Sequence, residues 1–201
     1  MRILIVTPLY PPDIAMPAPY VKELAKRLKG MHEISILAYN HIPEKIDGVR
    51  IVTISKDIPL LLRIIRFTRM LFIESKNVDL LFVQNGSSVE VPFSVVKLFS
   101  QCKSILYVSD AHAYTRMKSS FLFRIIFFCA QKSATHVSTS LRNTVTNHSS
   151  QLSQQKETYV ALPHREPEVH SLFSYPHDER TAYETSWSNH INELTTLFSH
   201  I

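Results

Sequence analysis

Two short runs of polar residues, each directly after an apolar segment, hold the side chains best suited to chemistry. The first run contains Asn85, Gly86, Ser87 and Glu90, and the second contains Ser109, Asp110 and His112. Carboxylate and imidazole groups can move a proton, while amides and hydroxyls can orient a substrate. We therefore treat Asp110 and His112 as candidate catalytic residues and the other five as candidate substrate-binding residues. For the first run, a turn followed by a helix cap is the competing interpretation.

These polar runs are positioned by apolar segments that alternate with helical ones along the chain. Apolar runs typical of strands fall at 3–6, 33–38, 49–54, 80–84, 104–108, 136–140 and 158–162. Helical patterns fall at 59–76, 89–99, 117–132 and 141–147. This alternation predicts an α/β fold, a single Rossmann-like domain with a mostly parallel sheet. Ligands bind such sheets at the carboxyl ends of the strands, where both polar runs lie.

The first apolar run leads into a proline-rich loop and then into an amphipathic helix. The prolines of this segment are Pro8, Pro11, Pro12, Pro17 and Pro19. They stiffen the loop and remove backbone donors from it. The helix places Val21, Leu24, Ala25 and Leu28 on one face. The loop emerges at the same edge of the sheet as the polar runs, so we expect it to be shaped for a ligand.

The pair Pro11-Pro12, followed by a helix containing Leu24-Ala25-Lys26-Arg27-Leu28, resembles the start of the family-four glycosyltransferases of the GT-B fold. The resemblance implies half of a GT-B architecture and transfer of a sugar from a nucleotide sugar, which is a donor substrate and not a cofactor. In the family a Gly-Gly pair follows the prolines and lets backbone amides approach the substrate. Ala15 and Met16 stand there instead, which argues against close diphosphate contact. Pro12, Ala15 and Met16 are the candidate substrate-binding residues of this loop.

The same resemblance gives the polar runs a role. In the family, the turn that matches Asn85-Gly86-Ser87 commonly helps to position an acceptor. A His-Asp pair often stands where this chain has Ser109-Asp110, so the aspartate is retained and the histidine is replaced. Asp110 and His112 are therefore expected to shape an acceptor pocket.

Length and the carboxyl-terminal tail set the expected domain organisation. The chain has 201 residues, enough for one substantial domain, whereas a complete GT-B enzyme needs two. The tail TSWSNHINELTTLF is similar to the closing helix of these enzymes. In the family, two glutamates eight positions apart bind the donor, and no two glutamates of this chain have that separation. We expect a Rossmann domain over 1–165, an irregular linker over 166–185 and a closing helix over 186–201 packed on the domain. The donor-binding domain is expected to be absent.

The net charge of +5 favours an anionic partner. Arg63, Arg66 and Arg69, three residues apart beside bulky apolar residues, fit a helix that contacts an anionic membrane surface. A core-packed helix whose arginines face water is the alternative. The basic residues lack nucleic-acid-binding patterns, so no nucleic acid is expected. Histidines and cysteines show no metal-ligand spacing, so no metal is expected.

No apolar run is long enough to span a bilayer, and a core strand follows Met1 directly. We therefore expect a cytoplasmic protein, peripheral to the inner face of the membrane if the arginines bind lipid.

Two functions of different class remain. The first is a glycosyltransferase-like protein that supplies the acceptor side of the site, with a donor-domain subunit as partner. Such a chain is expected to be inactive by itself. The second is a non-catalytic remnant or scaffold that binds a membrane or a partner enzyme.

Overall fold

The strand β1 (Arg2–Thr7) lies inside the sheet, between β2 and β4, and its unbroken apolar run explains this position. Successive side chains of a strand point to opposite faces, so Ile3 and Ile5 enter the core on one face of the sheet while Leu4 and Val6 enter the core on the other. Such a strand buries apolar side chains on both faces of the sheet, which favours a place between two layers of helices.

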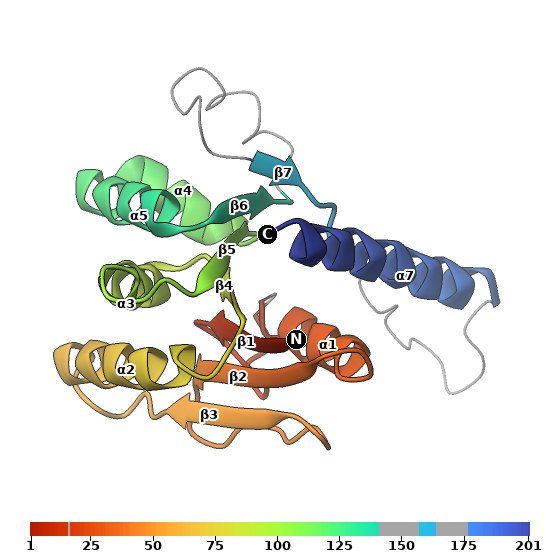
Figure 1. Ribbon diagram of the computed structural model, residues 1–201, viewed down its shortest axis with the longest axis horizontal. Coiled ribbons are helices and arrows are strands. Elements are labelled where there is room, and N and C mark those ends of the chain that lie inside the picture. Colours follow the sequence, from red (N-terminus) through yellow and green to blue (C-terminus); the bar gives the residue numbers. More distant parts are fainter. Residues whose placement is uncertain (16, 141–156, 164–176) are drawn as a thin grey trace.

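The computed structural model describes residues 1–15, 17–140, 157–163 and 177–201. Within these residues, seven strands form one sheet in the order β3-β2-β1-β4-β5-β6-β7, and every neighbouring pair is parallel (Figure 1). The other strands are β2 (Glu33–Tyr39), β3 (Arg50–Ile54), β4 (Leu80–Gln84), β5 (Lys103–Val108), β6 (His136–Thr139) and β7 (Glu157–Tyr159). The predicted α/β, Rossmann-like fold is confirmed.

Helices cover both faces of this sheet. On one side lie α1 (Pro17–Leu28) and α7 (His177–His200), and on the other lie α2 (Leu60–Ser75), α3 (Ser87–Lys97), α4 (Ala111–Ser119) and α5 (Phe121–Ser133) (Figure 1). Each side has its own apolar core, and Trp187 belongs to the first while Phe67 and Phe127 belong to the second. In a parallel sheet these helices run back against the strands, so α2 and α3 begin at the carboxyl edge of the sheet.

Two helical segments differ from the sequence-based expectation. The pattern at 117–132 belongs to two helices, because Ser120 adopts an extended conformation (φ −131°, ψ 130°) between α4 and α5. The last helix begins at His177, so residues 177–185 are helical and do not form a linker. Pro176 is the last proline of the chain, and no helix breaker follows it. The remaining expected linker and the helix expected at 141–147 lie outside the described residues.

The helix α7 lies against α1 and the sheet through a stripe of buried side chains. The stripe consists of Trp187, Ile191, Leu194, Leu197 and Phe198. The ring of Tyr20 in α1 stacks between Trp187 and Tyr107 of β5, with 5.7 Å between centroids on each side. The helix therefore completes the apolar core on its side of the sheet. Among the described residues, no helix combines the length and the apolar character needed to cross a membrane.

Candidate functional site

The loops after β4 and β5 are joined by the side chain of Asn85. Its Oδ1 accepts hydrogen bonds from the backbone amides of Ser109 (3.0 Å) and Asp110 (2.9 Å), and its Nδ2 donates to the Asp110 carbonyl oxygen (3.1 Å). Asn85 is buried, whereas Ser109 and Asp110 are half-buried. The structure thus brings three of the predicted site residues together. The Asn85 amide is, however, used to hold the loops and not to face a ligand.

Asp110 caps helix α4. Its Oδ1 accepts the amide protons of His112 (2.8 Å) and Ala113 (3.2 Å). This is the usual way for an aspartate to satisfy the first amides of a helix. The His112 side chain is exposed beside this cap. Of the two candidate catalytic residues, Asp110 is engaged with the backbone, and His112 is open to a ligand.

Gly86 and Glu90 form the turn into α3. The backbone of Gly86 has φ +155°, and a Cβ atom there would lie 3.1 Å from Cγ of Pro8 in the loop after β1. Glycine therefore permits the close approach of two loops at this edge. Glu90 Oε1 accepts the Gly86 amide proton at 3.0 Å, and burial raises the pKa of this carboxyl to about 7. Ser87 starts the helix and is half-buried.

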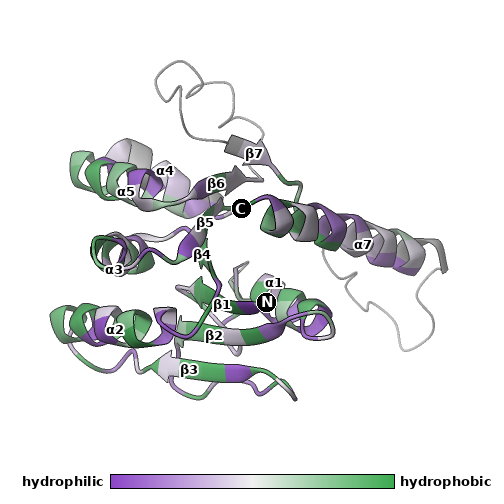
Figure 2. Cartoon of the chain, viewed as in Figure 1, coloured by the Kyte–Doolittle hydropathy of each residue, from purple (hydrophilic) through white to green (hydrophobic). Residues whose placement is uncertain are grey.

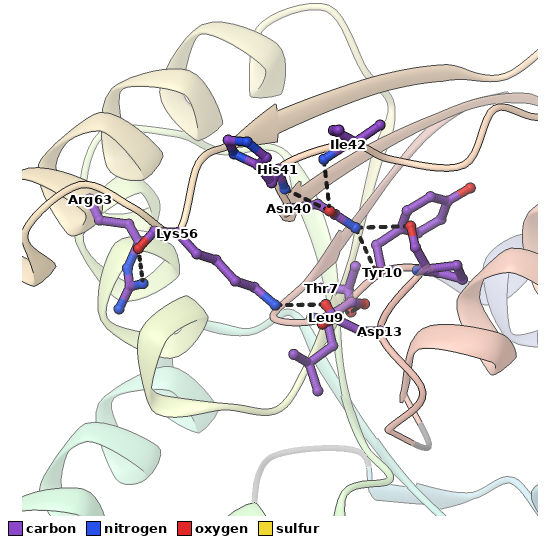
Figure 3. A network of polar contacts seen from close by, with 10 residues as sticks. Thr7, Leu9, Tyr10, Asp13, Asn40, His41, Ile42, Lys56 and Arg63 are labelled. Carbon is purple, nitrogen blue, oxygen red and sulfur yellow. Dashed lines mark hydrogen bonds and ion pairs between the residues drawn. The ribbon is translucent and has the colours of Figure 1, made fainter.

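The proline loop, residues 8–15, is held by polar contacts from neighbouring strand ends (Figure 3). Buried Asn40, directly after β2, donates from Nδ2 to the carbonyl oxygens of Tyr10 (2.7 Å) and Pro11 (2.9 Å). The Asn40 Oδ1 accepts the amide protons of His41 and Ile42. Lys56, which follows β3, forms an ion pair with Asp13 at 2.7 Å. The Pro11-Pro12 peptide bond is cis. The contacts of Asn40 and Lys56 tie the loop to the ends of β2 and β3.

A pocket of about 520 Å³ lies between the proline loop, α1 and the start of α7. Its apolar lining includes Pro12, Pro19, Tyr20, Tyr183 and Trp187. The charged side chains at this pocket are paired, since Lys22 forms an ion pair with Glu44 and Lys26 lies 3.7 Å from Glu23. Of the predicted site residues that the structure describes, only Pro12 lines it, so the pocket is separate from the polar runs after β4 and β5.

The remaining predicted residues are placed as follows. Ala15 is exposed, and Met16 lies outside the described residues. Arg66 and Arg69 are exposed on α2, as expected for a basic stripe. Arg63 is not part of it, because its guanidinium lies 5.5 Å from the centre of the Tyr39 ring and donates to the Lys56 carbonyl oxygen. In the part of the chain that the structure describes, no three His, Cys, Asp or Glu side chains gather as metal ligands would.

Sequence reasoning missed two parts of this edge. Asn40 was overlooked although it directly follows an apolar run, as Asn85 does. The aromatic wall formed by Tyr20 and Trp187 could not be found, because its members lie far apart in the chain.

No family model matches the sequence, and no curated protein matches it. Solved structures do match the fold. HepE from Anabaena, in complex with UDP and glucose, aligns with a TM-score of 0.58 at 11% identity over 82% of this chain and 45% of HepE. UGT2 from Phytolacca americana, complexed with UDP-2fluoro-glucose and pterostilbene, aligns with a TM-score of 0.53 at 10% identity over 83% of this chain and 55% of that one.

The fold is that of one half of a GT-B glycosyltransferase. The chain accordingly spans about half the length of these GT-B structures. A sucrose-phosphate synthase structure from Thermosynechococcus elongatus aligns with a TM-score of 0.55 at 10% identity, over 93% of this chain and 97% of that one. That solved chain is itself only part of the synthase, so the GT-B-like half seen here matches a piece of that enzyme of almost the same extent.

Proposed function

We propose that this chain forms the acceptor side of a family-four-like glycosyltransferase and that a separate polypeptide supplies the donor-binding side. The observation that supports the proposal is the fold, a seven-stranded parallel sheet that aligns with about half of HepE, a structure in complex with UDP and glucose. HepE was solved with UDP and glucose and UGT2 with UDP-2fluoro-glucose, which makes a nucleotide sugar the donor substrate to test first.

In this proposal the acceptor lies at the carboxyl edge of the sheet. The proline loop forms one wall, and the loops tied by Asn85 form the other. Exposed His112 is the group that contacts the acceptor and can take a proton from it. Asp110, which caps α4, positions His112 through the backbone. Charge on a leaving diphosphate would be stabilised by groups of the donor-binding side.

The second candidate is a non-catalytic scaffold, and one observation favours it. Asn85, Asp110 and Glu90 all use their side chains to satisfy backbone amides of this chain. Ala15, at the family's glycine position, also adds a Cβ atom where the backbone would approach a diphosphate. A fold kept for binding alone would show both features.

A transfer assay with a panel of nucleotide sugars separates the two candidates. We expect the purified chain alone to release no sugar above buffer background. Co-expression with a donor-binding polypeptide from a neighbouring reading frame should give transfer. His112→Ala should lower that transfer at least tenfold, an effect on the order expected for a lost acid-base group. The matched control is His41→Ala, another exposed histidine.

Each outcome decides between the candidates. Transfer that is equal in the His112→Ala and His41→Ala proteins removes the proposed role of His112. Absence of transfer with every partner favours the scaffold. Sugar release by the chain alone, abolished by Asp110→Ala, would show that no donor-side partner is needed.

A further inference from the structure

The outer surface of α2, α3 and α5 exposes an unusual number of large apolar side chains. We call this surface the helical face, and it lies on the opposite side of the sheet from α1 and α7 (Figure 1). Figure 2 colours much of these three helices as hydrophobic. Its exposed members are Leu60, Leu61, Leu62, Ile65, Ile73, Val95, Phe121, Leu122, Ile125 and Phe128, with Leu98 and Phe99 directly after α3. Phe121 is 76% exposed and Phe99 75%. Patches of this kind mark interaction surfaces in soluble proteins.

The charges on the helical face have one sign. Its exposed basic residues include Arg66 and Arg69 on α2 and Arg124 and Lys132 on α5. The only acidic residues in these three helices are Glu74 and Glu90, and both are buried. Glu74 is moreover held by Arg50 at 2.8 Å. No acidic side chain therefore offsets the exposed cations of these helices.

Arg66 and Arg69 are available to an outside ligand. Among the described residues neither side chain makes a hydrogen bond or an ion pair, in contrast to the side chain of Arg63. The exposed Leu62 lies four residues before Arg66, and the exposed Ile65 lies four residues before Arg69, so cations and apolar side chains share one side of α2.

We propose that the helical face docks on an anionic lipid surface, with its apolar side chains entering the boundary between headgroups and acyl chains. The charge pattern selects this occupant. A second copy would bring a face of the same positive sign and would repel the first, whereas an anionic bilayer offers negative charge and apolar depth together. The proposal does not depend on any sugar transfer, since the face shares no residue with the candidate site.

Docking also sets an orientation. The first turn of α2 carries Leu60, Leu61 and Leu62, and that of α5 carries Phe121 and Leu122. Helix α2 begins after β3 at the carboxyl edge of the sheet, so docking through its first turn brings the edge that bears the candidate site close to the lipid.

Vesicle flotation tests the proposal on the full chain. The two lipid preparations are phosphatidylcholine alone and equal parts of phosphatidylcholine and phosphatidylglycerol. We expect binding to the anionic vesicles that weakens with added sodium chloride, because salt screens surface charges. Arg66→Gln/Arg69→Gln should reduce partition roughly tenfold or more, since each cation near an anionic surface is worth about fivefold. Phe121→Asn/Leu122→Asn should reduce it on the order of tenfold.

The control is Ile42→Asn/Lys45→Gln, which removes an exposed apolar residue and an exposed cation from the connection between β2 and β3. Its partition should equal that of the parent chain. Equal binding to both vesicle types, or equal losses in the control and in the helical-face variants, would overturn the proposal. So would concentration-dependent dimerisation in sedimentation velocity that Phe121→Asn/Leu122→Asn abolishes, because a second copy would then occupy the face. All variants lie at exposed positions and should retain the parent's unfolding midpoint.

Discussion

The hydroxyl oxygen of Tyr20 lies 2.8 Å from Nε2 of His190, which is 170 positions away in the chain. The other ring nitrogen of His190, Nδ1, lies 2.7 Å from the carbonyl oxygen of Ala161. A carbonyl oxygen can only accept, so Nδ1 carries a proton, and in the neutral imidazole Nε2 then accepts from the tyrosine hydroxyl. A single neutral imidazole thus links α1, α7 and the segment after β7.

We predict that acid weakens this link. Burial lowers the pKa of His190 from 6.5 to about 4, because the charged imidazole would lose its hydration. Between these two values the unfolded chain binds a proton that the folded chain does not, so the free energy of unfolding falls as the pH is lowered through this range. The contribution of His190 to that loss is up to about 3 kcal/mol, complete below about pH 4.

The measurement is urea denaturation of the parent chain and of His190→Gln between pH 4 and 7. The difference in the free energy of unfolding between the parent and His190→Gln should shrink as the pH falls. His200→Gln, which removes an exposed histidine of the same helix, is the control and should track the parent. A constant difference between the parent and His190→Gln across this range would contradict the assigned neutral state.

The second prediction concerns α7 as a brace of the domain. Trp187 is 3% exposed, stacks on Tyr20 and lies 5.1 Å from the Arg27 guanidinium. Trp187→Ala should lower the free energy of unfolding by about 3–5 kcal/mol, the usual cost of deleting a large buried aromatic side chain. Thr196→Ala on the exposed side of the same helix should change it little. If both variants unfold at the parent's midpoint, the helix does not stabilise the domain.

Much of the fold was predictable because the sheet is buried on both faces. The expected strand at 80–84 matches β4 since all five of its residues are apolar or buried, and the amphipathic pattern of α1 likewise placed Leu24 in the core. The break between α4 and α5 was missed because Ser120 is neither glycine nor proline. The helical start of α7 was missed because the prolines before it, the last of which is Pro176, and the many charged residues around it indicated an irregular segment. In the structure Glu184 forms an ion pair with Arg27 of α1 at 2.9 Å.

The site was less predictable than the sheet, and the reason is geometric. The sequence places Asn85 and Asp110 at strand ends, which is where they lie. Whether such a side chain faces a ligand or the chain's own backbone depends on a loop that follows a different strand. Asn85 finds its partners 24 and 25 positions away, so its structural role becomes visible only after β4 and β5 pair.

The third prediction is that Asn40 fixes the proline loop. Asn40→Ala removes two donors from the carbonyl oxygens of Tyr10 and Pro11 and one acceptor from the amides of His41 and Ile42. The side chain is 5% exposed, so some of these groups lose their partner in a buried place, at a cost of about 1–3 kcal/mol. Limited proteolysis within residues 10–15 should become faster. Asn77→Ala, at an exposed position, is the control, and equal cleavage rates in the two variants would refute the role.

The last prediction concerns Glu90, whose buried carboxyl changes the free energy of unfolding with pH in the opposite direction to His190. Burial raises its pKa from 4.5 to about 7, so in this range the folded chain holds a proton that the unfolded chain has released. The free energy of unfolding therefore falls as the pH rises from 4.5 to 7, by up to about 3 kcal/mol. The window overlaps that of His190, where the trend has the opposite sign. The free energy of unfolding of the parent chain should consequently vary less with pH than it would if only one of the two groups titrated.

Glu90→Gln reveals how much the Glu90 carboxyl contributes to the pH dependence of stability. The variant keeps an oxygen that accepts the Gly86 amide proton but carries no titrating group. We expect its stability relative to the parent to be nearly constant below pH 4.5 and to rise by about 3 kcal/mol towards pH 7 and above. Glu33→Gln, which changes an exposed glutamate, should show no such rise in urea denaturation over the same range. A flat difference between Glu90→Gln and the parent would mean that the Glu90 carboxylate is stabilised in place, so that the turn between β4 and α3 could hold a negative charge at neutral pH. A rising difference means that Glu90 is largely protonated below pH 7, and the turn then offers a neutral carboxyl group beside the Gly86 amide.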